Sequence, residues 1–251
     1  MGRSPHKLSR WLALCCFYTH LSRKFLGFEV DHFNLESLRL LYDEIFVREE
    51  YFFNSDKVNP VIFDCGANIG MATLFFKWLY PESTVTAFEP DPDSFGLLQH
   101  NIKANHLQRV SAYNIALWDS EARIPFFVDD HEHGALTMST KRDRGRGRQI
   151  EVEARRLSDF IAGPVDLLKV DVEGAETRVL CELIASGKMA YVRRMILEYH
   201  HHIGKEPAQL GSFFTMLEHS GWNYQLNTWS FPLSKVGSFQ DILIYAYRDS
   251  N

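Results

Sequence analysis

Residues 61–70 read Val-Ile-Phe-Asp-Cys-Gly-Ala-Asn-Ile-Gly, and they combine three local signals in one short stretch. An apolar run ends in Asp64, a loop bounded by Gly66 and Gly70 follows, and a helix-like pattern then covers Met71–Tyr80. Glycines at a strand-to-helix turn let the backbone come close to a ligand, and the helix N-terminus offers free N–H groups. The segment therefore predicts a ligand-binding turn between a strand and a helix.

A second strand signal lies shortly after this helix. The apolar run Thr84–Phe88 stops at Glu89-Pro90. An acid at the end of the second strand of such a unit is placed to accept hydrogen bonds from ribose hydroxyls. The loop and this acid together predict a cofactor that contains a nucleoside.

The identity of the cofactor depends on the charge and spacing within the loop. A dinucleotide site requires the pattern G-x-G-x-x-G, and the middle glycine is missing here. The negative charge of Asp64 would also repel a pyrophosphate, whereas it suits a positive amino group. S-adenosylmethionine carries an amino-acid ammonium and no phosphate, so the loop favours this cofactor over NAD and makes a dehydrogenase the weaker alternative.

The remainder of the chain alternates strand and helix patterns, which predicts an α/β fold with a parallel sheet and right-handed crossovers. A closing antiparallel pair is expected at 224–228 and 242–247. The other expected strands cover 110–116, 123–129, 149–155, 165–171 and 194–200, and the expected helices cover about 71–80, 91–105, 174–185 and 207–219, with a short one at 157–161.

Residues 1–56 are predicted to form a helical N-terminal segment, and residues 57–251 the domain that binds the cofactor. Apolar residues recur at helical spacing over 35–46, and the N-terminal segment forms either a cap over the cofactor mouth or a packing layer. The apolar run 11–18 is too short to span a bilayer, which needs ~20 apolar residues, and we interpret it as an amphipathic helix.

Composition narrows the class of protein further. The chain has 251 residues, and 45% of them are hydrophobic, which is enough to bury a sizeable core. Its net charge of -5 creates no positive electrostatic field that would favour nucleic acid as a partner. Its 4 cysteines are scattered without the paired spacing of a zinc site. A reduced, cytoplasmic protein without a transmembrane segment is expected.

Several of these stretches together resemble the FkbM family of S-adenosylmethionine-dependent methyltransferases. The resemblance covers roughly residues 42–247 and rests on 64–70, 88–90, 115–117, 168–176 and 196–198, of which Lys-Val-Asp-Val-Glu-Gly-Ala-Glu at 169–176 is the most specific. It implies a class I methyltransferase fold, with a mostly parallel seven-stranded sheet and helices on both faces. It also implies O-methylation of a sugar or natural-product hydroxyl.

The resemblance and the residue pattern together predict the cofactor site. Gly66 and Gly70 would line the methionine end, and Glu89 would bind the ribose. Ala116 and Leu117, together with Trp118 or Asp119, would lie near the adenine. The predicted cofactor-binding residues are Asp64, Gly66, Ala67, Asn68, Gly70, Glu89, Pro90, Ala116, Leu117 and Asp171, and S-adenosylhomocysteine would be the product.

The catalytic residues are predicted at the carboxyl ends of two adjacent strands, where Asp171, Glu173, Glu198 and His200 would face the transferable methyl group. A hydroxyl acceptor needs a base, and His200 is the favoured one, with Asp171 or Glu173 as alternatives. Glu176 is as consistent with a helix N-terminal charge as with catalysis. A divalent metal is possible at Asp171, Glu198 and His200, but their spacing is not a recognised motif and no metal is predicted.

The sequence leaves the identity of the methyl acceptor open. Arginines within residues 141–148, together with His131 and His133, could contact an anionic acceptor such as a phosphorylated sugar or RNA, although a solvated surface loop is favoured. A small-molecule acceptor is expected and nucleic acid is the less favoured substrate. A cofactor-binding module without activity is the remaining alternative, and the sequence does not indicate an oligomeric state.

Overall fold

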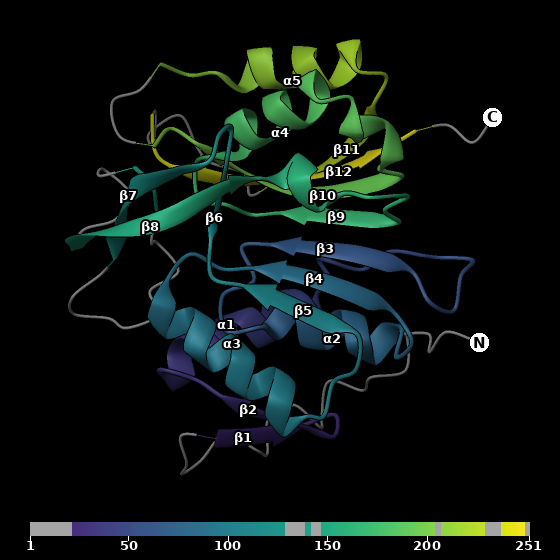
Figure 1. Cartoon of the computed structure of the whole chain (residues 1–251), viewed down its shortest axis with the longest axis vertical. Coiled ribbons are helices and arrows are strands. Elements are labelled where there is room, and N and C mark those ends of the chain that lie inside the picture. Colours follow the sequence, from purple (N-terminus) through teal and green to yellow (C-terminus); the bar gives the residue numbers. More distant parts are fainter. Residues whose placement is uncertain (1–21, 129–138, 142–146, 204–206, 229–236, 249–251) are drawn as a thin grey trace.

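A seven-stranded sheet organises the molecule. The computed structural model describes residues 22–128, 139–141, 147–203, 207–228 and 237–248. The sheet has the order β11-β12-β10-β9-β3-β4-β5 (Figure 1). Only β12 runs antiparallel to its neighbours in this sheet. The predicted α/β fold, with a mostly parallel sheet and a closing antiparallel pair, is confirmed.

The strands of this sheet are β3 (Val61–Cys65), β4 (Thr84–Phe88), β5 (Val110–Tyr113), β9 (Leu167–Val170), β10 (Arg194–His201), β11 (Asn223–Thr228) and β12 (Gln240–Tyr247). The main helices are α1 (Leu35–Tyr42), α2 (Met71–Leu79), α3 (Pro92–Ala104), α4 (Glu176–Ala185) and α5 (Leu210–His219). Short helical turns cover Asp43–Val47 (π-helical), Leu157–Phe160 and Lys188–Tyr191. These bounds agree with the predicted ones to within a few residues.

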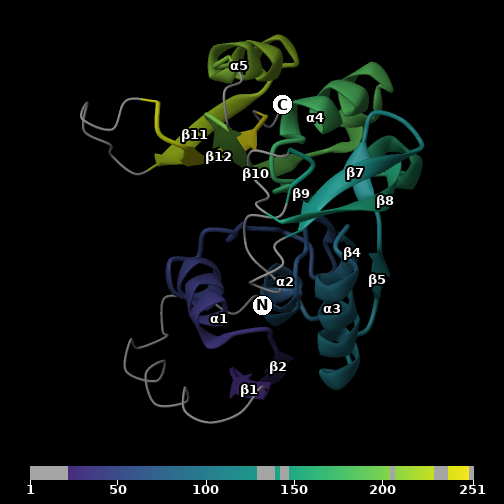
Figure 2. The same cartoon turned by 90° about the vertical axis from the view of Figure 1, so that its left-hand side faces the viewer.

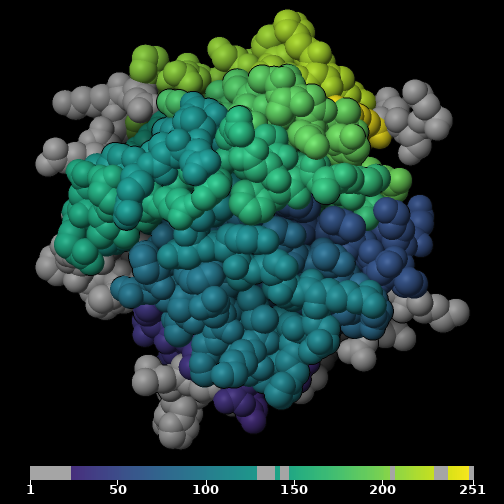
Figure 3. All heavy atoms as spheres, in the orientation of Figure 1, coloured from purple at the N-terminus to yellow at the C-terminus, as the bar shows by residue number. Residues whose placement is uncertain are grey.

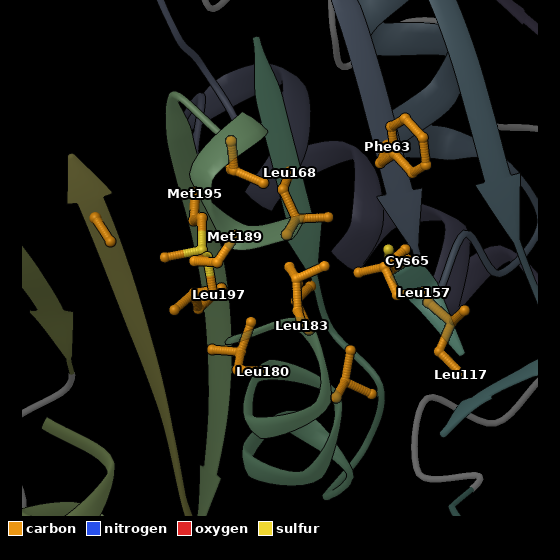
Figure 4. Close-up of a cluster of buried hydrophobic side chains, with 14 of the residues drawn as sticks. Phe63, Cys65, Leu117, Leu157, Leu168, Leu180, Leu183, Met189, Met195 and Leu197 are labelled. Atoms are coloured by element: carbon orange, nitrogen blue, oxygen red, sulfur yellow. The ribbon is translucent and has the colours of Figure 1, made fainter. Parts of the chain in front are cut away.

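Alternating side chains of the central strands pack into two separate apolar cores, one on each face of the sheet. Phe63, Leu168 and Leu197 point to one face, where they pack with Leu180 and Leu183 of α4 (Figure 4). Their neighbours Ile62, Leu167 and Ile196 point to the other face, against α1 and α2. In both cartoon views α4 and α5 lie on one side of the strands and α1, α2 and α3 on the other (Figures 1 and 2). Strands buried on both faces explain why these runs are continuously apolar.

The N-terminal segment differs from the prediction. Residues 22–31, expected to be helical, form a hairpin of β1 (Ser22–Phe25) and β2 (Phe28–Asp31), whereas the predicted amphipathic helix at 11–18 lies outside the described residues. A hairpin is stable here because two asparagines of α3 satisfy the backbone of β2. Asn101 Oδ1 accepts from Asp31 N at 2.7 Å, and Asn105 Oδ1 accepts from Glu29 N at 2.7 Å. These partners are about 70 residues away in sequence, so no local pattern indicates them.

The expected single strand 110–116 is in fact two. β5 ends at Tyr113, and β6 (Ala116–Trp118) leaves the main sheet to pair with β8 (Arg148–Arg156), which also pairs with β7 (Ala122–Val128). Asn114 marks the break, because its amide donates to the carbonyls of Glu89 and Pro90. This break turns Ala116 and Leu117 towards the carboxyl end of β4.

On the face seen in Figure 3, the teal part of the chain and the green part meet along one continuous surface. Among the helices of the described ranges, none is both long and apolar enough to cross a bilayer.

Candidate active site

A cavity of about 300 Å³ lies at the carboxyl edge of β3, β4, β9 and β10. It occupies the position at which open α/β sheets bind ligands. Most of the predicted site residues line it, namely Gly66, Ala67, Asn68, Glu89, Pro90, Ala116, Leu117, Asp171, Glu173 and Glu198. Asp64, Gly70 and His200 do not line this cavity.

The loop after β3 is folded onto the end of β4. The N–H groups of Gly66 and Ala67 both donate to the Phe88 carbonyl at 2.9 Å. Gly66 has a φ of +82°, and a Cβ built on it would lie 1.7 Å from the Asp171 carbonyl oxygen. Only glycine allows this approach between the β3 and β9 loops, so Gly66 shapes the floor of the cavity.

Glu89 is a buried acid that directly follows β4. Its two carboxylate oxygens accept hydrogen bonds from Asn68 N and Asp91 N, each at 2.8 Å. Burial raises the pKa of Glu89 to about 8, against the effect of these two hydrogen bonds. Since a carboxylate oxygen has more than one lone pair, the ionised group can also accept from ligand hydroxyls.

This pKa leads to a prediction for ribose binding. Glu89 loses its proton as the pH rises through about 8, so a ligand held by the ionised carboxylate should bind more tightly at pH 9 than at pH 7. We expect this for 5′-methylthioadenosine, which has ribose hydroxyls but no amino-acid group that titrates. Calorimetric titration across this range checks it, and the trend should disappear in Glu89→Gln; a pH-independent affinity in the natural protein would contradict the ribose role.

Asp64 lies beneath the loop rather than in the cavity wall, which corrects its predicted contact with the cofactor ammonium. It is fully buried, Thr73 Oγ1 donates to its Oδ2 at 2.6 Å, and Lys169 Nζ lies 3.6 Å from its Oδ1. The Asp64 carboxylate therefore fixes the start of α2 and one buried lysine.

Lys169 was not among the predicted site residues, yet it lies at the centre of the site. Its ammonium donates to the Gly66 carbonyl at 2.7 Å and to Asp171 Oδ2 at 3.1 Å. Burial opposes its charge, but Asp171 and Asp64 outweigh that effect, and the pKa of Lys169 is raised. The lysine side chain points back under the β3 loop, and alternation along β9 is the one sequence signal that places it on the face of Asp64.

Gly70 also has a structural role, which corrects its predicted place at the methionine end. It is the left-handed N-cap of α2, with a φ of +94°, and a Cβ there would lie 2.8 Å from a methyl carbon of Leu98. Its position lets α2 and α3 pack closely behind the loop.

One end of the cavity is strongly acidic. The predicted Asp171, Glu173 and Glu198 are joined there by Glu44 and Asp241, which the sequence did not indicate. Burial, and next to it the charge of Glu50, raises the pKa of Glu44 to about 7. Glu44 lies in the π-helical turn after α1, a type of irregularity that is frequent at functional sites.

The N-terminal segment contributes part of the wall at this acidic end. Leu40, Leu41, Glu44, Ile45 and Tyr51 all line the cavity. Tyr51 OH donates to Glu198 Oε2 at 3.2 Å. The segment also belongs to the apolar core around α2, so it forms a packing layer, and its role as a cap over the cofactor mouth stays a prediction.

His200 is buried directly behind the acidic end. Its Nδ1 lies 2.7 Å from Glu176 Oε1, and its Nε2 lies 3.2 Å from Glu173 Oε2. Burial opposes a charge on the ring, but Glu173 and Glu176 outweigh it, so the pKa of His200 lies well above its ordinary value. His200 does not line the cavity, and its predicted role as the base stays a prediction.

Other predicted contacts lie elsewhere. Trp118 and Asp119 line a larger surface groove beside α4, where Arg178 stacks on Trp118, and not the cavity. His131, His133 and the arginines at 142, 144 and 146 lie outside the described residues.

The sheet order, with one antiparallel strand next to the last position, and the glycine loop with a buried acid at the end of β4 are those of a class I methyltransferase. A family model for the methyltransferase FkbM domain matches residues 64–226. The chain belongs to the FkbM family of S-adenosylmethionine-dependent methyltransferases.

Named relatives agree with this assignment. The chain is 31% identical to 31-O-demethyl-FK506 methyltransferase FkbM of Streptomyces tacrolimicus over 206 residues, which cover 69% of this chain and 79% of the relative. It is 32% identical to Methyltransferase 1 of Beauveria bassiana (57% of this chain, 66% of the relative). It is 30% identical to 2-O-methyltransferase NoeI of Sinorhizobium fredii (53% and 59%).

A solved structure supports the fold. The methyltransferase FkbM of Methylobacillus flagellatus superposes with a TM-score of 0.54 at 16% identity, covering 82% of this chain. The present chain corresponds to 48% of that longer chain.

Proposed function

We propose that the protein transfers the methyl group of S-adenosylmethionine to a hydroxyl oxygen of a small molecule, such as a sugar or a natural product. The observation that carries this proposal is the cavity itself, which joins a nucleoside-type loop at one end to a cluster of carboxylates at the other. Two relatives named as O-methyltransferases support the oxygen acceptor.

In this proposal the cofactor lies along the loop after β3. The ribose binds Glu89, the adenine lies against Ala116 and Leu117, and the methionine end passes Gly66 towards Asp171. The glycine loop, Asn68 and Pro90 form the remaining wall. The methyl group then faces Asp171, Glu173 and Glu198, which orient the acceptor hydroxyl for in-line displacement.

A first experiment tests the cofactor and the reaction together. S-adenosylhomocysteine is titrated into the protein by calorimetry, and a panel of sugars and hydroxylated natural products is then incubated with methyl-labelled S-adenosylmethionine. We expect binding and label transfer to at least one hydroxyl. Absence of binding would overturn the proposal, and binding with no transfer to any acceptor would favour a cofactor-binding module.

The proton of the acceptor hydroxyl needs a base, and Glu44 fits this role. It lines the acidic end of the cavity, and its pKa of about 7 suits proton abstraction near neutral pH. We expect Glu44→Gln to lower kcat by about 10²- to 10⁴-fold, the usual contribution of a general base, with unchanged affinity for S-adenosylhomocysteine.

The pH profile separates this role from a structural one. Because the base acts only when ionised, the rate of the natural protein should rise as the pH passes about 7, and Glu44→Gln should lack this rise. Glu36→Gln, on the exposed side of the neighbouring helix α1, is the matched control and should keep both rate and profile. An unaltered profile in Glu44→Gln would reject Glu44 as the base.

A further inference from the structure

We propose that Asp171, Glu198 and His200 bind one divalent cation of the Mg²⁺ or Mn²⁺ type at the acidic end of the cavity. One ligand atom from each of these side chains lies within 4.8 Å of the others. Oxygen ligands with one imidazole suit these hard or borderline ions better than a thiolate-preferring metal.

The distances around His200 Nε2 fit ligands that share an ion. Asp171 Oδ1 lies at 3.8 Å and Glu198 Oε1 at 4.0 Å. Two ligand atoms that are each about 2.1 Å from one metal lie between roughly 3.0 and 4.2 Å apart, depending on the angle. Asp241 Oδ1, at 3.7 Å, and Glu173 Oε2, at 3.2 Å, border the same point and could complete the coordination.

In both Asp171 and Glu198, one carboxylate oxygen is already hydrogen-bonded to another side chain. Asp171 uses Oδ2 for Lys169, and Oδ1 is the oxygen nearest to His200. Glu198 accepts from Tyr51 OH with Oε2, and its Oε1 is the oxygen nearest to His200. The second oxygen of each group is therefore directed to a common point.

His200 supplies an observation that is independent of the acids. Its Nε2 is buried and makes no hydrogen bond within the described residues, although it points into the carboxylate cluster. Its Nδ1 meets Glu176, which is 2% exposed and also accepts from Gly174 N at 2.7 Å. A histidine whose other ring nitrogen is held by a buried carboxylate is the usual arrangement behind a metal ligand.

The charges that line the cavity also favour a bound cation. Glu44, Asp171, Glu173, Glu198 and Asp241 line one end of the cavity, and Lys169 is the one lysine or arginine among the described lining residues. A divalent ion would offset this excess of negative charge. This part of the inference rests on the proposed function: the ion would bind the acceptor hydroxyl and lower the pKa of that hydroxyl, so that the base removes the proton more easily.

The test measures metal binding directly, without turnover. Protein stripped with a chelator is titrated with Mn²⁺, and free Mn²⁺ is followed by electron paramagnetic resonance, with Mg²⁺ as competitor. We expect one Mn²⁺ per chain, displaced by Mg²⁺. His200→Gln and Asp171→Asn should each weaken binding by at least tenfold, and Glu176→Gln by about 10- to 100-fold, as expected for a residue that orients a ligand.

His219→Gln is the matched control, because His219 is exposed at the end of α5 and does not line the cavity. Failure of the natural protein to bind Mn²⁺, or equal binding by all of these variants, would overturn the inference. The natural-protein titration decides even if a variant fails to fold. If the protein binds S-adenosylhomocysteine but fails to bind Mn²⁺, the metal site alone is rejected. If it binds Mn²⁺ but fails to bind S-adenosylhomocysteine, the proposed function is rejected.

Discussion

A Gly66→Ala variant is expected to lose most of its affinity for S-adenosylhomocysteine and a large part of its stability. The new Cβ would lie 1.7 Å from the Asp171 carbonyl oxygen, and the backbone at this residue is left-handed. The left-handed conformation costs about 1–2 kcal/mol for a non-glycine residue, and forced overpacking about 1–3 kcal/mol. Together these lower the free energy of unfolding by roughly 2–5 kcal/mol, or about 4–20 °C in Tm for a chain of this size.

Gly96→Ala is the matched control for this substitution. Gly96 is an exposed residue within α3, and no atom lies within 4 Å of a Cβ built on it. Alanine is the better helix former, so Tm should stay the same or rise slightly. Thermal unfolding and calorimetric titration measure both variants, and normal cofactor affinity in Gly66→Ala would show that the two loops need not approach so closely.

Lys169→Met is expected to be the most destabilising change in the wall of the site. Removing the ammonium leaves Asp64 fully buried without its counter-charge, and Asp171 and the Gly66 carbonyl lose a donor. Breaking a buried pair by removing one partner costs about 3–5 kcal/mol. Urea unfolding should show a loss of this size.

The control for this prediction is Lys103→Met on the exposed side of α3, for which we expect a change within about 0.5 kcal/mol. The double variant Lys169→Met with Asp64→Asn should recover part of the lost stability, because no buried charge is then left beneath the loop. If the single variant were as stable as the natural protein, Lys169 would not be the residue that holds these loops together.

Sequence patterns predicted most elements of the sheet because each strand carries its own signal. The apolar runs at 61–63 and 167–168 lie in largely buried strands, and Gly66 and Asp171 follow where these strands end. The same local signals singled out Gly66 and Glu89, which both line the cavity, and their cofactor roles stay predictions. The hairpin at 22–31 was missed because its backbone is satisfied by side chains of α3, which lie far away in the sequence.

The roles of side chains are harder to predict from the sequence where neighbouring charges decide the chemistry. A free histidine has a pKa that suits proton transfer, but four carboxylate oxygens from three separate elements and loops lie within 4.0 Å of the Nε2 of His200. Asp241 reaches this point only because β12 pairs antiparallel with β10 and places it opposite His200. Such electrostatic effects depend on distance in space, which spacing along the chain does not reveal.

Local sequence patterns alone predict the α/β class, the glycine loop and an acid at the end of β4, since each depends on residues that are close together in the chain. The tertiary structure decided that Asp64 and Lys169 support the loop from below, that Glu44 and Asp241 join the acidic end, and that His200 lies behind it. Those roles arise where separate strands and the N-terminal segment meet at one edge of the sheet, and only folding brings their charges within reach of one another.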